Sequence, residues 1–204
     1  MISNVEEQRL ELQHGIRIEW ISVGWMIVEA IVAIGAGVRA HSIALIAFGA
    51  DSVVELAAGA ILLWRLSVEA DGASGERLGL VERRAERFVG AALLLLAFYI
   101  VVASVRALLL HEGPAAASLG ISITAASSIL MPILARAKRR IGARIESRAL
   151  EADGACSMVC AYMSWIVLAG VAATALLGWW WIDSIAALGI VYFVFHEGWE
   201  AIAG

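Results

Sequence analysis

The sequence predicts an all-α membrane protein with six transmembrane helices and both termini in the cytoplasm. Hydrophobic residues make up 61% of its 204 residues, and the mean hydropathy is +0.84. This composition excludes an ordinary soluble domain. Apolar runs of about 18 or more residues are long enough to cross a hydrocarbon core of about 30 Å. Their period and length are typical of helices, and the alternating pattern of barrel strands is absent from the sequence.

Six runs meet this criterion and define the expected organisation of the chain. We expect a polar cytoplasmic segment at 1–17, without the features of a signal peptide, followed by one six-helix transmembrane domain at 18–204. The expected spans are 18–38, 42–65, 88–110, 117–136, 149–177 and 182–203.

Positive charge is concentrated in two of the connections between the spans. The connections after the second and fourth spans are rich in arginine, whereas only Arg39 and Arg106 lie near the opposite side. The positive-inside rule therefore puts both termini and both basic connections in the cytoplasm, and we expect a bacterial inner membrane. The basic connection 135–148 has two interpretations, an orientation-setting loop or an ion-handling surface. We prefer the first, because a basic loop repels cations.

Two spans carry polar side chains at one depth. Asp51 and Glu55 lie four residues apart, about one helical turn, in an otherwise apolar run where acids are costly unless something uses them. Asp153, Cys156 and Cys160 lie on one stripe of the fifth span. Because the two spans are antiparallel, both polar groups lie about 15 Å deep at 1.5 Å per residue. Small residues around both stripes would let the two helices pack closely. We therefore predict a midplane metal site built from these five residues.

The donor types limit the metal. Two carboxylates and two thiolates suit tetrahedral Zn²⁺, thiolates favour softer ions such as Cd²⁺, and Mg²⁺ fits poorly. Simpler roles remain open, since membrane cysteines are often packing residues and Asp153 is also placed to cap a helix start. Glu29, near midplane depth, is either a proton carrier or a partner of a residue such as a serine. Asp183 is as suited to helix capping as to ion handling.

Several motifs of this chain resemble the cation diffusion facilitator transporters. They are His41-Ser42-Ile43-Ala44-Leu45, Asp51-Ser52-Val53-Val54-Glu55, Ser147-Arg148-Ala149-Leu150-Glu151-Ala152-Asp153 and Trp181-Ile182-Asp183-Ser184-Ile185-Ala186-Ala187-Leu188. The resemblance implies a zinc-type divalent cation/proton antiporter, usually a homodimer. It also implies a central site with an acid pair on the second helix and a His/Asp pair on the fifth. By position, Asp51 and Glu55 match the first pair, and Cys156 and Cys160 match the second.

The chain departs from this family pattern in three ways. Both family-typical residues of the fifth helix are cysteine, the fourth-to-fifth connection has no histidine, and the sequence ends at Gly204 directly after the sixth span. We therefore expect no cytoplasmic C-terminal domain, and a homodimer that forms through the membrane helices. The cation is cargo, so no cofactor is expected, and the expected partners are metal ions, protons and the bilayer, not nucleic acid.

Charge balance predicts proton coupling. Four ionised ligands would carry four negative charges, of which a divalent cation neutralises two, so protons must cover the rest. Alternating access then needs only a rocking of helices around the midplane site.

We expect no enzymatic activity. The alternatives are a metal-binding scaffold or sensor that does not transport, and an intramembrane thiol oxidoreductase. The second is disfavoured because Cβ atoms at i and i+4 are about 5–6 Å apart, too far for a disulfide.

Overall fold

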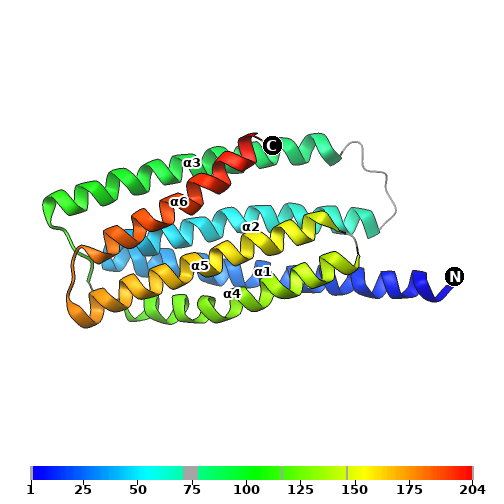
Figure 1. Ribbon diagram of the computed structural model, residues 1–204, viewed down its shortest axis with the longest axis horizontal. Coiled ribbons are helices and arrows are strands. Elements are labelled where there is room, and N and C mark those ends of the chain that lie inside the picture. The colour runs from blue at the N-terminus through cyan, green and yellow to red at the C-terminus, as the bar shows by residue number, and fades with distance from the viewer. Residues whose placement is uncertain (1, 71–77, 116, 146, 204) are drawn as a thin grey trace.

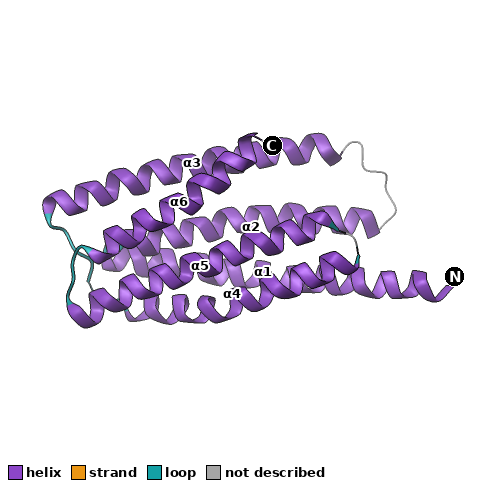
Figure 2. Cartoon of the chain, in the orientation of Figure 1, coloured by secondary structure: helices purple, strands orange, loops and turns teal. Residues whose placement is uncertain are grey.

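The computed structural model is a bundle of long helices joined by short connections (Figure 1). It describes residues 2–70, 78–115, 117–145 and 147–203, and within these ranges all regular structure is helical (Figure 2). The helices are α1 (Ile2–Ala40), α2 (Ile43–Ala70), α3 (Leu78–Leu110), α4 (Ser118–Arg144), α5 (Arg148–Leu177) and α6 (Ile182–Ala203).

Consecutive helices run in opposite directions, and the described helices form three closely packed pairs, two of them between consecutive helices. α1 packs most extensively on α2, α4 on α5 and α3 on α6. α1, α2, α4 and α5 lie together, and α3 and α6 run along one side of them (Figure 1). The largest fully buried apolar side chains lie where these helices meet, because each helix turns part of its apolar surface inward; they include Met26, Phe48, Met131, Met163 and Ile190.

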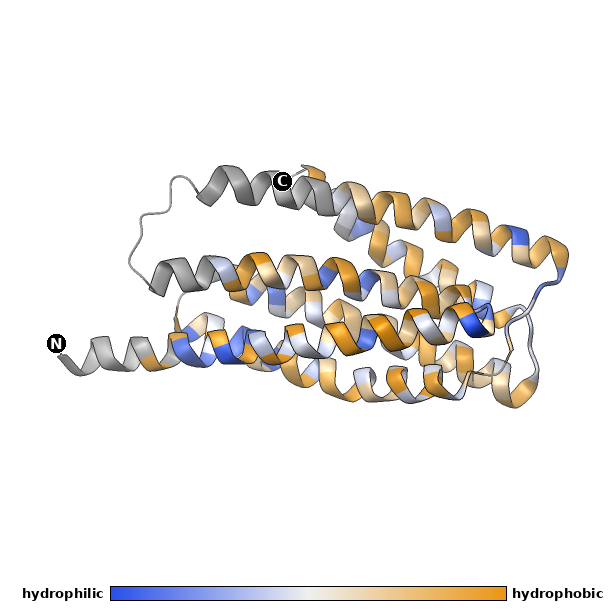
Figure 3. Ribbon diagram, turned by 180° about the vertical axis from the view of Figure 1, so that it is seen from behind, coloured by the Kyte–Doolittle hydropathy of each residue, from blue (hydrophilic) through white to orange (hydrophobic). Residues whose placement is uncertain are grey.

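The structure agrees with an integral membrane protein. Apolar residues run along most of each described helix (Figure 3). Among the described residues, five segments are long and apolar enough to cross a membrane. These are Leu12–Ala40, Ile43–Trp64, Gly90–Leu110, Ser118–Arg144 and Ala149–Leu177. The sixth expected span coincides with α6, which is 22 residues long, and its passage through the membrane stays a prediction.

Several helices extend past the limits expected from hydropathy. α1 begins at Ile2, within the expected polar segment, and α3 begins at Leu78, ten residues before the expected third span. Residues 71–77 of the basic connection between the second and third spans lie outside the described residues. Hydropathy marks where a helix leaves an apolar environment, and backbone hydrogen bonding continues beyond that point.

The expectation that 135–148 forms a loop was wrong, whereas its role in setting the orientation in the membrane stays a prediction. α4 continues to Arg144, so most of this segment is helical. Lys138, one of the basic residues of this segment, is fully buried. The reason is local, because acidic side chains of neighbouring helices meet its ammonium group. A charge in an amphipathic segment need not face solvent when it has such partners.

Glycines allow the backbones of paired helices to lie close together. A Cβ on Gly49 of α2 would lie 2.9 Å from the backbone nitrogen of Ile34 in α1. A Cβ on Gly154 of α5 would lie 3.0 Å from the carbonyl oxygen of Ala135 in α4. Small residues therefore bring α2 close to α1 and α5 close to α4. The expectation that they act between α2 and α5 does not hold for these two glycines.

Candidate metal centre

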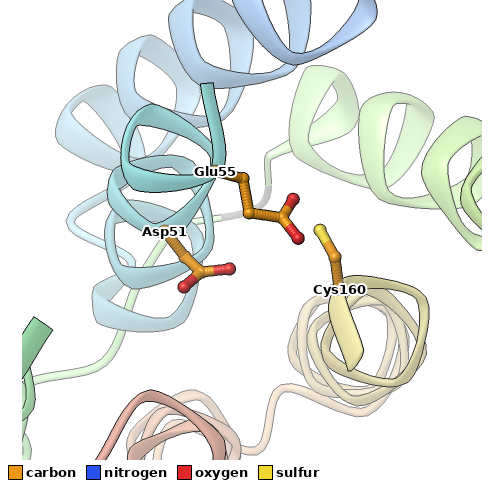
Figure 4. A group of neighbouring side chains, drawn as sticks. All are labelled: Asp51, Glu55 and Cys160. Atoms are coloured by element: carbon orange, nitrogen blue, oxygen red, sulfur yellow. The ribbon is translucent and has the colours of Figure 1, made fainter. Parts of the chain in front are cut away.

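Two acids of α2 and one thiol of α5 form a buried cluster. Asp51, Glu55 and Cys160 each offer one ligand atom, and these atoms all lie within 4.8 Å of one another. Asp51 is 1% exposed, Glu55 8% and Cys160 0%. The two acids lie one turn apart on α2 and point toward the thiol of Cys160, which lies on the facing helix α5 (Figure 4). We call these three residues the central cluster.

The size and donors of the central cluster fit a soft or borderline divalent ion. Tetrahedral bonds of about 2.0–2.3 Å place ligand atoms roughly 3.3–3.8 Å apart. Separations of up to 4.8 Å therefore need a contraction of about 1 Å, which is within the range of side-chain rotation. Two carboxylates and one thiolate are donors that Zn²⁺ accepts, and the sulfur favours Cd²⁺.

The other two predicted ligands lie elsewhere. Cys156 is exposed and does not belong to the central cluster, although it has interactions of its own. Asp153 accepts a hydrogen bond of 2.5 Å from the Lys138 ammonium. It does not act as a helix cap either, because α5 is capped by Ser147, whose hydroxyl accepts from the Leu150 N–H.

Glu29 of α1 lies beside the central cluster and is fully buried. Its carboxylate accepts hydrogen bonds from Trp25 Nε1 at 2.9 Å, from Ser52 Oγ at 2.6 Å and from Ser127 Oγ. Cys160 Sγ donates to Glu29 Oε1 at 3.7 Å. Of the two roles considered for Glu29, pairing with serines is the one observed.

Sequence reasoning missed Ser52 and Ser127 as members of this surrounding network. Ser52 lies between Asp51 and Glu55 in the chain, and its hydroxyl oxygen also lies 3.0 Å from the carbonyl oxygen of Phe48. A serine flanked by buried acids in an apolar helix is the signal that could have identified Ser52. Ser127 has only α4 residues as sequence neighbours, so its contact with α1 could not be inferred from spacing.

Asp183 caps a helix, but not its own. It accepts from Ser42 Oγ at 2.5 Å and from the backbone N–H of Ile43 at 2.8 Å, with a longer bond of 3.4 Å from Ala44 N–H. The Ile43 and Ala44 N–H groups are among the first N–H groups of α2, which have no acceptor within the helix. A carboxylate there also interacts favourably with the helix dipole. Asp183 thereby fixes the start of the helix that carries Asp51 and Glu55.

The helical bundle and the buried acid–thiol cluster define an integral membrane protein with a candidate internal cation site. Comparison with known protein families identifies the family of this membrane protein. The cation efflux transmembrane domain matches residues 20–203. The chain therefore belongs to the cation efflux family, the cation diffusion facilitators that its motifs resemble. Members of this family are cation transporters.

Two relatives illustrate the match. An uncharacterized transporter of Synechocystis sp. is 30% identical over 182 residues, which cover 87% of this chain and 58% of the relative. Transmembrane protein 163 of Xenopus laevis is 30% identical over 151 residues, covering 74% of this chain and 52% of that protein. The chain thus spans little more than half the length of these relatives.

Proposed function

We propose that this protein transports a zinc-like divalent cation, with Cd²⁺ and other soft ions as further substrates, through the central cluster. The observation that carries the proposal is the convergence of three buried ligand atoms, from Asp51, Glu55 and Cys160, within 4.8 Å. Buried acids inside membrane helices are costly and typically mark ion pathways. The match to the cation efflux domain supports the same conclusion.

Proton exchange follows from charge. With all three ligands ionised, the central cluster carries three negative charges, and a divalent cation leaves one uncompensated. Metal entry therefore releases protons from the ligands, and their return from the other side of the membrane favours metal release. In this scheme the protein is a metal/proton antiporter. Rocking of helix pairs around the fixed cluster gives alternating access.

Topology, location and assembly complete the proposal. The N-terminus and the basic α4–α5 connection lie at the same end of the bundle (Figure 1), and the positive-inside rule assigns that end to the cytoplasm. We assign the protein to a bacterial inner membrane, and we propose that it forms a homodimer, as its family resemblance implies. Cross-linking in native membranes tests the dimer.

The decisive experiment is metal-dependent proton flux in proteoliposomes. Purified protein should move Zn²⁺ and Cd²⁺ with opposite movement of protons, and should move Mg²⁺ far more slowly because thiolate and few oxygen ligands suit it poorly. Absence of flux for every divalent ion, with metal binding retained, would replace transport by a scaffold or sensor role.

Asp51→Asn is the first variant for this assay. It keeps the side-chain volume and removes a buried charge, so the fold should persist while metal transport is lost. Thermal unfolding of the purified variant controls for folding. Zn²⁺ transport at the wild-type rate in Asp51→Asn would remove Asp51 from the transport site.

A further inference from the structure

The chain has one lysine, Lys138, and its side chain is fully buried. It is surrounded by Glu19, Asp153 and Ser157, which we call the acidic cage. Its Nζ is 2.5 Å from Asp153 Oδ2 on α5 and 3.1 Å from Glu19 Oε2 on α1. Ser157 Oγ lies 3.3 Å from the same nitrogen. The lysine ammonium thus lies among oxygen atoms of two carboxylates and a hydroxyl, as a bound cation would.

This cage carries more acid than its lysine neutralises. Glu19 is 0% exposed, and within the described structure no hydrogen-bond donor reaches its Oε1 atom. Two carboxylates face one ammonium, so one negative charge is left when all three groups are ionised. A divalent cation in place of the ammonium would balance both carboxylates. Carboxylate and hydroxyl oxygens are ligands that divalent cations accept.

The cage lies next to the central cluster along the helices. A Cβ on Gly59 of α2 would lie 2.8 Å from Glu19 Oε1, and Gly59 is one helical turn beyond Glu55, about 6 Å along the axis. On α5, Asp153 is seven residues from Cys160, about 10 Å in the same direction. Both displacements lead toward the end of the bundle that holds the α4–α5 connection (Figure 1).

We propose that Glu19 and Asp153, with Ser157, form a second cation site through which the transported divalent ion passes, and that Lys138 fills this site between passages. The inference rests on the proposed transport function. The arriving ion binds the two carboxylates and displaces the ammonium, which swings toward the bundle end. Lys138 is six residues before Arg144, the end of α4, about 9 Å at 1.5 Å per residue. A lysine side chain covers much of that distance by snorkelling.

The return of Lys138 completes the exchange. Once the ion has moved to the central cluster, the two carboxylates again attract the ammonium, which closes the route behind the ion. No proton transfer or covalent step is needed, because one bound cation replaces another. Lysine suits this role better than arginine, since its charge is compact and its stem is flexible.

The single lysine makes the exchange measurable. Full-length protein in detergent is treated with an amine-reactive reagent, with and without Cd²⁺ at matched ionic strength, and modification of Lys138 is followed by mass spectrometry. Cd²⁺ should raise the modification rate at least about fivefold, because the rate follows the population in which a buried group is exposed. An unchanged rate overturns the proposal.

Two variants separate this site from the central cluster. Asp51→Asn should keep the Cd²⁺-induced labelling of Lys138, whereas Glu19→Gln should lose it. Equal labelling increases in wild type and Glu19→Gln would overturn the proposal. Failure of the transport proposal would appear separately, as absence of divalent-cation flux by the wild-type protein in proteoliposomes.

A direct binding measurement covers the case in which Glu19→Gln does not fold. In the Asp51→Asn background, Lys138→Gln removes the competing ammonium and should tighten Cd²⁺ binding at least about tenfold in equilibrium dialysis, since a competitor for the same site is lost. Unchanged affinity in this double variant would mean that the cage is only a structural ion pair.

Discussion

Cys156 and Cys160 lie one turn apart on α5 in contrasting surroundings. Cys160 is buried in the central cluster, and Cys156 is exposed. Four residues advance a helix by about 400°, so two such side chains point about 40° apart. At the edge of a packed face this angle is enough to bury one thiol and expose the other.

These two cysteines provide a matched pair of substitutions. Cys160→Ser should weaken Cd²⁺ binding at least about tenfold and lower the preference for Cd²⁺ over Zn²⁺, because a soft thiolate ligand is lost. Cys156→Ser should leave both quantities close to wild type. Competitive Cd²⁺/Zn²⁺ binding on the three proteins decides the matter. Equal losses in both variants would restore the four-ligand site expected from sequence.

At this scale, helical spacing is enough to predict that Asp51 and Glu55 share a face and meet the cysteine stripe. It is not enough to choose between Cys156 and Cys160, or to assign Asp153. Asp153 lies on the predicted stripe, but its nearest charged partner is Lys138 of α4. That pairing depends on the helical extension of α4 to Arg144, which hydropathy does not predict.

Among the elements, α1 and α2 depend on close approach for their packing. A Cβ on Gly49 would meet Ile34 Cγ1 at 2.7 Å as well as the Ile34 backbone nitrogen. Gly49 lies two residues before Asp51, so any separation of α1 and α2 there displaces the central cluster. The network of Glu29 with Ser52 crosses the same interface.

Gly49→Ala should therefore destabilise the protein by about 1–3 kcal/mol, the usual cost of overpacking. It should also weaken metal binding, because Asp51 moves with the helix. Gly35→Ala is the control on α1, where an added Cβ meets nothing within 4 Å; it should be neutral or stabilising by up to about 1 kcal/mol. Apparent melting temperatures in detergent compare the two. A Gly49→Ala protein as stable as Gly35→Ala would contradict the close α1–α2 contact.

The ends of a helix could be predicted only where the helix ends at the same residue as its apolar run. α5 and α6 begin within a residue of the expected limits, and both end where expected, because turn residues flank them; Gly178, with φ of 66°, ends α5 in the left-handed conformation. α1, α2, α3 and α4 run further than expected, because charged residues continue a helix outside the apolar layer. The capping of α2 by Asp183 joins residues 140 positions apart and has no local signal.

For the whole molecule, the number and order of helices follow from the six apolar runs of the sequence. Inside a membrane each run must form its backbone hydrogen bonds within a helix or a closed barrel. The pairing of α1 with α2 and of α4 with α5 follows from short connections. The packing of α3 on α6 does not, because these helices are distant in sequence and both are apolar on most sides.

The pH dependence of metal binding is a property of the whole transport cycle. Carboxylate and thiol ligands must be deprotonated to bind a metal, so each ion that enters the central cluster releases the protons held there. Raising pH lowers the cost of that release, and the affinity therefore rises with pH. Release of one proton per ion corresponds to about tenfold tighter binding per pH unit, or about 1.4 kcal/mol. Between pH 6 and 8 we expect Zn²⁺ affinity, measured by calorimetry in buffers of different ionisation enthalpy, to rise at least about tenfold with net proton release. Affinity that stays flat over this range, with no proton release, would contradict metal/proton exchange and would leave a cation carrier driven by the metal gradient alone.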